Sequence, residues 1–467
     1  MIGLFFAGIL AIYSTGFVIR KAVFSREPAL LSGPEKFGLD IGFGCGGMAL
    51  VFFYLSFSGI RLSGNVMMAV TVVFAASALV IIMGNRMKGR GGVPDMPKKP
   101  SIKKFDIILV IVIAVSVSVI FFKSLYYPMY EWASRSCFGF KAKILHDSGT
   151  IYDKSFIDKE FVIEHPEYPL MVPLLEDWMY TVMRTDDDRF GKGFLPFMAL
   201  GFLSLMYGAQ RRFCGSTHCL VYTLLYSLIY VFVYRFACAE ADAPLAFFYF
   251  GAGALMFLWI CSGKTPYIVS SSLFTAFAIF TKNEATSFFV ILTACLLLSL
   301  FFSRMPLRDK AKAAFIYMGL TLALSTPWLI YRFTSLPSTD VLVNEKTFFN
   351  AGVINTITAK MSRHSLIMDN FIFDIVLKTR KWNLFWILFF VAQILSLKEL
   401  FKKPVVYLAF IVWSTLILYY TMFILVDLPL DHMLIGMDRF ALQVSGLVLL
   451  LISLLNCKKL HPDEGGI

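Results

Sequence analysis

Residues 106–125 read DIILVIVIAVSVSVIFFKSL, an almost unbroken apolar run that follows Lys103 and Lys104. A helix that crosses a bilayer needs about 20 apolar residues, so this stretch predicts a membrane span. The rest of the chain repeats the pattern. Runs of the same kind centre near residues 2–19, 40–60, 65–84, 193–210, 217–236, 243–262, 266–281, 285–303, 313–331, 384–397, 404–425 and 440–456.

The composition of the whole chain agrees with this pattern. The 467 residues are 58% hydrophobic and only 16% charged, whereas a soluble domain carries about 25% charged and about 45–50% apolar residues. A soluble enzyme is therefore excluded, and the sequence predicts an all-α polytopic membrane protein with about thirteen transmembrane helices. The net charge of +12 is attributed to basic cytoplasmic loops, so no nucleic-acid partner is expected.

The distribution of Lys and Arg predicts the orientation of these spans. The stretch 85–104 is the most basic loop, and basic loops face the cytoplasm. The chain should therefore begin outside and end inside, with outer loops at about 126–192 and 333–383. Apolar residues at helical spacing in the first loop, such as Leu174 and Trp178, predict interfacial helices at the membrane surface.

The first outer loop begins with a cluster of chemically useful side chains. Glu131 lies just beyond the fourth span, where its carboxylate could remove a proton from an acceptor. Lys141 and Lys143 follow and could hold a phosphate. The alternative is that this cluster only anchors the loop at the membrane interface.

Two further clusters contain acids beside other polar groups. The stretch 164–170 places two prolines around His165, Glu167 and Tyr168, and proline rigidifies such a turn. We interpret Glu167 as a candidate catalytic carboxylate and His165 and Tyr168 as substrate-binding, although the stretch could be a purely structural turn.

The next cluster is a short outer turn between two spans. Asp242 is a candidate catalytic carboxylate there, with Arg235 and Glu240 as substrate-binding residues. The alternative is that Asp242 merely caps the following helix, a role that would require neither Arg235 nor Glu240.

The last two clusters contribute cations. Lys282 and Glu284 lie between two short apolar runs, and Arg439 precedes the final one. A lysine and an arginine at the membrane boundary could bind a lipid-linked phosphate, with Glu284 binding substrate. The alternatives are a polar turn at Lys282 and an interfacial, snorkelling Arg439.

The order of these clusters resembles that of bacterial GT-C membrane glycosyltransferases, in the superfamily of protein O-mannosyltransferases and aminoarabinose transferases. The stretches ADAPLA at 241–246 and TKNE at 281–284 are the most specific. The resemblance rests on 132–143, 165–170, 241–246, 280–284, 326–328 and 438–439.

This resemblance implies a GT-C-like catalytic core over 106–467, preceded by additional helices and a basic loop over 1–105. It implies an inverting glycosyltransferase, a hexosyl- or pentosyltransferase, that takes its sugar from a polyprenyl phosphate. The acceptor would be an envelope glycan, a lipid or a protein, reached from the periplasmic face of a bacterial inner membrane among membrane lipids. No cofactor is required, although a divalent metal is possible, and no metal ligands are predicted.

One position departs from the family. Relatives carry an acidic residue after the tryptophan of the first outer loop, where this chain has Ala133. The base is then Glu131, Glu167 or Asp242. Two alternatives to catalysis stay open: a transporter or flippase of a lipid-linked glycan, and a non-catalytic GT-C-like protein. A transporter should place its charges near the bilayer midplane, whereas these charges lie at the outer ends of spans.

Overall fold

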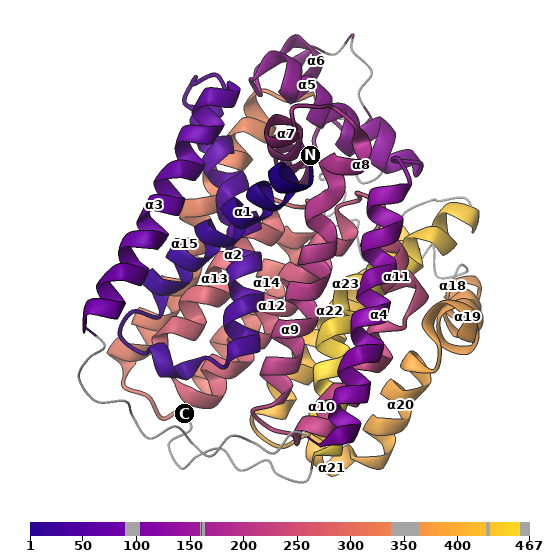
Figure 1. The fold of residues 1–467 in the computed structure, drawn as a ribbon. Helices are drawn as coiled ribbons and strands as arrows, with labels where there is room; N and C mark the ends of the chain where they lie inside the picture. Colours follow the sequence, from indigo (N-terminus) through magenta and orange to yellow (C-terminus); the bar gives the residue numbers. More distant parts are fainter. Residues whose placement is uncertain (89–102, 159, 161–163, 338–363, 426–429, 458–467) are drawn as a thin grey trace. The chain divides into compact units, whose positions relative to one another are not determined.

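The computed structural model describes residues 1–88, 103–158, 160, 164–337, 364–425 and 430–457. Those residues form helices and connecting segments and contain no β-strand (Figure 1). The chain folds into two compact units. The first consists of 1–156, 169–227 and 236–240, and the second of 157–168, 228–235 and 241–467. Residues 89–102 of the predicted basic loop and residues 338–363 of the second outer loop lie outside the described residues.

The first unit is built from the N-terminal helices. They are α1 (Ile2–Val23), η1 (Pro28–Leu30), α2 (Gly33–Phe57), α3 (Gly64–Lys88), α4 (Lys104–Tyr126), η2 (Ser134–Gly139), α5 (Phe140–Ser148), α7 (Met171–Met183), α8 (Asp188–Gly191), η3 (Lys192–Phe194), α9 (Leu195–Gln210) and α10 (Ser216–Ser227). The short α6 (Lys154–Ile157) lies at the chain boundary between the units.

The second unit contains the remaining helices. They are α11 (Tyr230–Arg235), α12 (Asp242–Ser262), α13 (Thr265–Ile279), α14 (Ala285–Phe301), α15 (Leu307–Thr334), α18 (His364–Asn370), η5 (Phe371–Leu377), α19 (Thr379–Trp382), α20 (Phe385–Leu395), α21 (Leu397–Leu400), α22 (Val405–Leu425) and α23 (Leu430–Asn456).

The chain is an integral membrane protein, and the predicted all-α class is confirmed. Nine helices within the described residues are long and apolar enough to cross a membrane, and α13, α14 and α20 are shorter apolar helices. The count of thirteen is not confirmed. The run predicted at 217–236 is divided into α10 and α11 by two residues, Leu228 and Ile229, which belong to neither helix. The nine long segments are Ile2–Val23, Gly33–Phe57, Gly64–Gly84, Lys104–Tyr126, Asp188–Gln210, Asp242–Ser262, Leu307–Thr334, Val405–Ile424 and His432–Asn456.

Helix α2 forms the centre of the first unit, where it packs against α1, α7 and α9. It begins with a capping box, in which the Ser32 side chain and the Glu35 side chain each bond the other residue's backbone N–H. Glycines let α1 and α2 cross closely. A Cβ atom added at Gly16 would lie 1.7 Å from the Asp40 carbonyl oxygen, and one at Gly44 would lie 2.1 Å from that of Ile12.

This close crossing predicts that Gly44→Ala destabilises the protein, because the added methyl forces two backbones apart. Overpacking of this kind costs about 1–3 kcal/mol. Gly84→Ala is the matched control, since a Cβ at Gly84 meets no atom within 4 Å. Thermal unfolding in detergent should show a lower midpoint for Gly44→Ala alone. Equal midpoints for the two variants would contradict the close crossing.

The amphipathic segment predicted in the first outer loop is present as α7. Its Trp178 is buried, and the indole N–H donates to the Gly8 carbonyl of α1 at 3.2 Å. Nearly every residue of the helix is buried, and α1, α2 and α5 pack against it. The apolar face that the sequence showed is therefore covered by protein helices of the same unit.

Helices α12 and α23 form the centre of the second unit. They pack against each other, α13 also packs against α12, and nearly all of the spanning residues of α12 and α23 are buried (Figure 1). Asp242 is the first residue of α12, so this acid lies at the end of one of the two central, buried helices of the unit. The predicted division of the chain at residue 105 stays a prediction.

Candidate functional site

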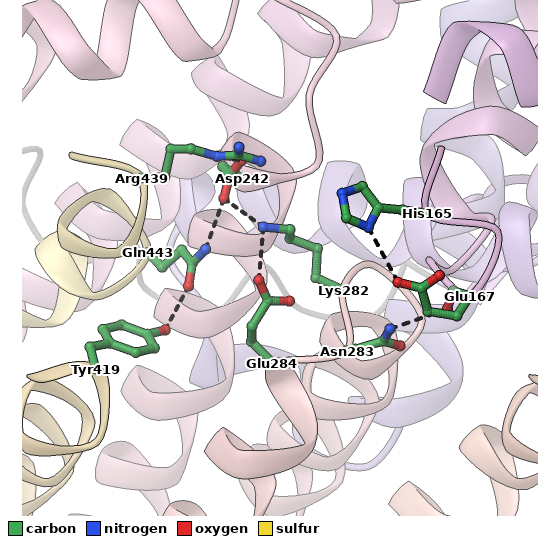
Figure 2. A network of polar contacts seen from close by, with 9 residues as sticks. All are labelled: His165, Glu167, Asp242, Lys282, Asn283, Glu284, Tyr419, Arg439 and Gln443. Carbon is green, nitrogen blue, oxygen red and sulfur yellow. Dashed lines mark hydrogen bonds and ion pairs between the residues drawn. The ribbon is translucent and has the colours of Figure 1, made fainter. Parts of the chain in front are cut away.

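Asp242 is the centre of a polar network in the second unit (Figure 2). Its side chain is fully buried. It accepts hydrogen bonds from Lys282 Nζ at 3.0 Å, Gln443 Nε2 at 2.8 Å and Arg439 Nε at 2.7 Å. The alternative of a helix cap is wrong, because Ala241 is the N-cap of α12 and no side chain caps that end. Three donors, two of them cationic, therefore hold this carboxylate in one position and compensate its negative charge.

Lys282 follows the end of α13 and joins two acids. Its ammonium donates to Asp242 and lies 2.9 Å from Glu284 Oε1. The side chain is 3% exposed, so the ion pairs compensate a charge that has lost its water. The Tyr168 ring lies below it, with Nζ 5.8 Å from the ring centroid, a distance suited to a cation–π contact.

Arg439 and Gln443 approach Asp242 from α23. They are four residues apart and therefore share one face of that helix. The Gln443 carbonyl oxygen accepts a hydrogen bond of 2.6 Å from the Tyr419 hydroxyl of α22, which fixes the orientation of the amide. The Arg439 side chain is 23% exposed. Of the two cations on Asp242, Arg439 is thus the more open to a ligand, and snorkelling does not describe its contact with a buried acid.

The turn at 164–169 carries the second group of predicted residues. His165 has a positive φ of 50°, and its Nδ1 lies 3.3 Å from Glu167 Oε1. The imidazole stacks on the Tyr168 ring at a centroid distance of 4.5 Å. Asn283 donates from its side-chain amide to the Glu167 carbonyl oxygen at 3.1 Å, so the turn is attached to the loop that contains Lys282.

Asp438 fixes the segment beside Arg439. Its carboxylate accepts a 2.9 Å hydrogen bond from the Trp382 indole and also pairs with Lys381. Both partners belong to α19. These contacts tie α19 to α23 one residue before Arg439 and help to hold that guanidinium at Asp242.

The structure thus brings together predicted residues that lie far apart in the sequence. Asp242, Lys282, Glu284 and Arg439 form one network, and His165, Glu167 and Tyr168 pack against its lysine loop (Figure 2). Arg235 belongs to the same unit, is buried, interacts electrostatically with Asp242 and lies over the Tyr234 ring at 5.4 Å.

Four other predicted residues belong to the first unit. Lys143 pairs with Asp188 at 3.1 Å. Lys141 and Glu240 are buried, and Glu131 is half-buried just before η2. The roles predicted for these residues are not tested by their positions.

Two members of the network, Gln443 and Tyr419, were missed by the sequence analysis. A neutral amide and a phenol within apolar helices carry no motif of their own. The one available signal for Gln443 was its spacing of four residues from Arg439. No group of three or more His, Cys, Asp or Glu side chains that could hold a metal ion occurs among the residues that the structure describes.

Comparison with known proteins gives one distant similarity. No protein-family model and no curated protein matches the chain. The structure is similar to the archaeal oligosaccharyltransferase AglB from Archaeoglobus fulgidus, solved with an inhibitory peptide and a dolichol-phosphate. The TM-score is 0.43 and the identity 10%, over 76% of this chain and 50% of that one.

The chain therefore spans half the length of AglB.

Proposed function

We propose that this protein transfers a sugar from a polyprenyl-phosphate donor to an acceptor at the extracytoplasmic membrane face. The observation that carries the proposal is the convergence of Lys282 and Arg439 on buried Asp242 at the end of a membrane-spanning helix. Arg439 is held by α23 and Lys282 by the loop between α13 and α14. Of the two cations, the partly exposed Arg439 is the one that a phosphate at the membrane boundary can meet. Such preorganised charge favours a reaction in which negative charge develops on a leaving phosphate.

The solvent exposure of each side chain in the network suggests its role in this reaction. Arg439, the more open cation, binds the donor phosphate, and its planar guanidinium suits two oxygens of that group. Asp242 and Lys282 are enclosed, so they position Arg439 and set the charge of the site. Gln443 and Tyr419 keep Asp242 in one orientation.

Glu167 is the proposed base. Its side chain is 18% exposed, whereas the carboxylate of Asp242 is enclosed and accepts three donors. Glu167 takes the proton of the acceptor hydroxyl as that oxygen attacks the anomeric carbon. The bond from this carbon to the phosphate oxygen breaks, and polyprenyl phosphate leaves with the electron pair. Attack opposite the leaving group inverts the anomeric centre.

The partners and the place of the reaction belong to the same proposal. The acceptor is an envelope glycan, a lipid or a protein, and the sugar is a hexose or pentose. The predicted topology places the reaction on the periplasmic face of a bacterial inner membrane. His165, Tyr168, Arg235, Glu240 and Glu284 bind substrates in this scheme. Lys141 and Lys143 remain predicted phosphate ligands, and Glu131 remains an alternative base.

The test is reconstitution of the purified protein in proteoliposomes with polyprenyl-phosphate hexoses or pentoses and candidate acceptors. Transfer of sugar to an acceptor, with release of polyprenyl phosphate, is the expected result. Movement of the lipid-linked sugar across the bilayer without transfer would instead identify a flippase and overturn the proposal.

Arg439 offers a specific prediction within that assay. Arg439→Gln should lower kcat/KM for the donor by about 10- to 100-fold, equivalent to about 1.4–2.7 kcal/mol. Arg439→Lys should recover only part of this, because an ammonium lacks the planar pair of donors. Initial rates at varied donor concentration provide the measurement. The control is Arg332→Gln on α15, whose guanidinium lies over the Phe333 ring. Equal kcat/KM values for Arg439→Gln and the unmodified protein would rule out the phosphate role.

A further inference from the structure

The first unit contains a pocket that the proposed reaction does not use. It has a volume of about 300 Å³. Its walls come from three segments: the turn between α2 and α3 with Arg61, the end of α5 with His146 and Asp147, and the end of α7 with Thr181 and Arg184. All of these residues belong to the first unit.

Hydrogen bonds give the pocket a defined wall. The Arg61 guanidinium donates from Nε to the Ser148 carbonyl oxygen at 3.0 Å, and the Leu62 N–H donates to the Gly149 carbonyl oxygen at 2.7 Å. Gly149 has a φ of 67°, and a Cβ there would lie 2.9 Å from Arg61 Cγ. A glycine is therefore needed for the turn and for the close approach of Arg61. The arginine is held at the pocket by this backbone.

Two guanidinium groups line the pocket. Arg61 and Arg184 are both exposed, and neither forms an ion pair with a described residue. Arg184 terminates α7 with a φ of 56°, an uncommon conformation for a residue with a side chain. The lining contains one carboxylate, that of the exposed Asp147, beside these two guanidinium groups. Asp177 and Asp186 lie outside the lining and act on His146.

His146 adds a donor to the same pocket. Its Nδ1 lies 2.9 Å from Oδ1 of Asp177, a buried acid of α7. The hydrogen bond that His146 donates to the Asp177 carboxylate raises the pKa of His146, against the opposing effect of burial. With Nδ1 directed at Asp177, the protonated form of the ring carries a second N–H at Nε2 that can donate to a ligand in the pocket. The imidazole also packs edge-to-face on Tyr180, at a centroid distance of 5.7 Å, which fixes the plane of the ring.

We propose that this pocket binds a phosphate group, with Arg61 and Arg184 as charged donors and His146 Nε2 as a third donor. Two guanidinium groups and an imidazolium suit the several oxygens of a phosphate. The group comes from a phospholipid head or from a free phosphate ligand, and in either case the chemistry of recognition is the same. The site is separate from the proposed reaction, because no residue of the Asp242 network lines it.

The test is isothermal titration calorimetry of the full chain in non-ionic detergent with two probes, inorganic phosphate and short-chain phosphatidic acid. Short-chain diacylglycerol, which lacks the phosphate, controls for binding through the acyl chains. The double variant Arg61→Gln/Arg184→Gln should bind the phosphate probes at least tenfold more weakly, and His146→Gln should also weaken them. Arg189→Gln is the matched control, since this exposed arginine of the same unit pairs with Asp187.

The titrations are repeated with protein that also carries Arg439→Gln, which weakens phosphate binding at the proposed donor site. Failure of the pocket proposal can then be distinguished from failure of the proposed function. Binding of both phosphate probes that depends on Arg61 and Arg184 supports recognition of the phosphate itself. Binding of phosphatidic acid alone, with the same dependence, supports a lipid head-group site. Binding of neither probe, or equal affinities of the double variant and the Arg189→Gln control, would overturn the proposal.

Discussion

Glu167→Gln is expected to lower the rate of sugar transfer by about 10²- to 10⁴-fold, the usual contribution of a general base. The substitution keeps the shape of the side chain and removes its ability to take a proton at neutral pH. Its backbone anchor remains, because the Asn283 amide bonds the Glu167 carbonyl oxygen and not its carboxylate. The loss should therefore appear in kcat, with little change in the thermal midpoint.

Glu399→Gln is the control for the loss of one carboxylate in the same unit. That residue belongs to α21, where it pairs with Lys402 at 2.6 Å, and its replacement should leave transfer unchanged. Glu131→Gln measured in parallel distinguishes the two candidate bases. A large loss in Glu131→Gln together with normal turnover in Glu167→Gln would move the base to the first unit.

The sequence predicted the stretch around Asp242 as a candidate site. It could not predict which side chains would pair with Asp242. Each apolar run predicts a span by a local property, its length and hydropathy. The contact of Asp242 with Arg439 joins residues 197 positions apart, and it depends on which helices pack together. The motifs that contain Asp242, Lys282 and Arg439 identified the chemistry without its geometry.

The environment of α7 shows the same limit. Apolar residues at helical spacing around Leu174 and Trp178 correctly predicted a helix with an apolar side. They predicted that this side would lie at the membrane surface, whereas α1, α2 and α5 pack against the helix, because the spacing is the same against lipid and against protein. Gln443 could not be recognised from the sequence because a glutamine in an apolar helix carries no motif. Only its hydrogen bonds with Tyr419 and Asp242 show that it belongs to the network.

Asp242→Asn is expected to abolish transfer and to destabilise the protein by about 3–5 kcal/mol, the cost of removing one partner of a buried ion pair. In the native network Lys282 and Arg439 are balanced by Asp242 and Glu284. The asparagine leaves Arg439 without its acidic partner and the buried Lys282 with Glu284 alone. The midpoint of thermal unfolding in detergent measures the loss of stability.

A second substitution shows whether the loss of stability comes from the unbalanced charge or from the loss of one hydrogen bond. Asp242→Asn/Arg439→Gln keeps the pair of Lys282 with Glu284 and removes the cation that Asp242→Asn leaves without its acid. It should be more stable than Asp242→Asn alone, with a coupling of about 0.5–3 kcal/mol, while transfer stays absent because Asp242 is still missing.

Asp374→Asn serves as the control, since this acid pairs with Lys378, an exposed residue four positions along the chain, and such pairs contribute about 0–1 kcal/mol. If the double variant were as unstable as the sum of its two single variants, the cations would not be held by charge balance. Arg439 would then have to reach the donor phosphate by some means other than its anchor on Asp242.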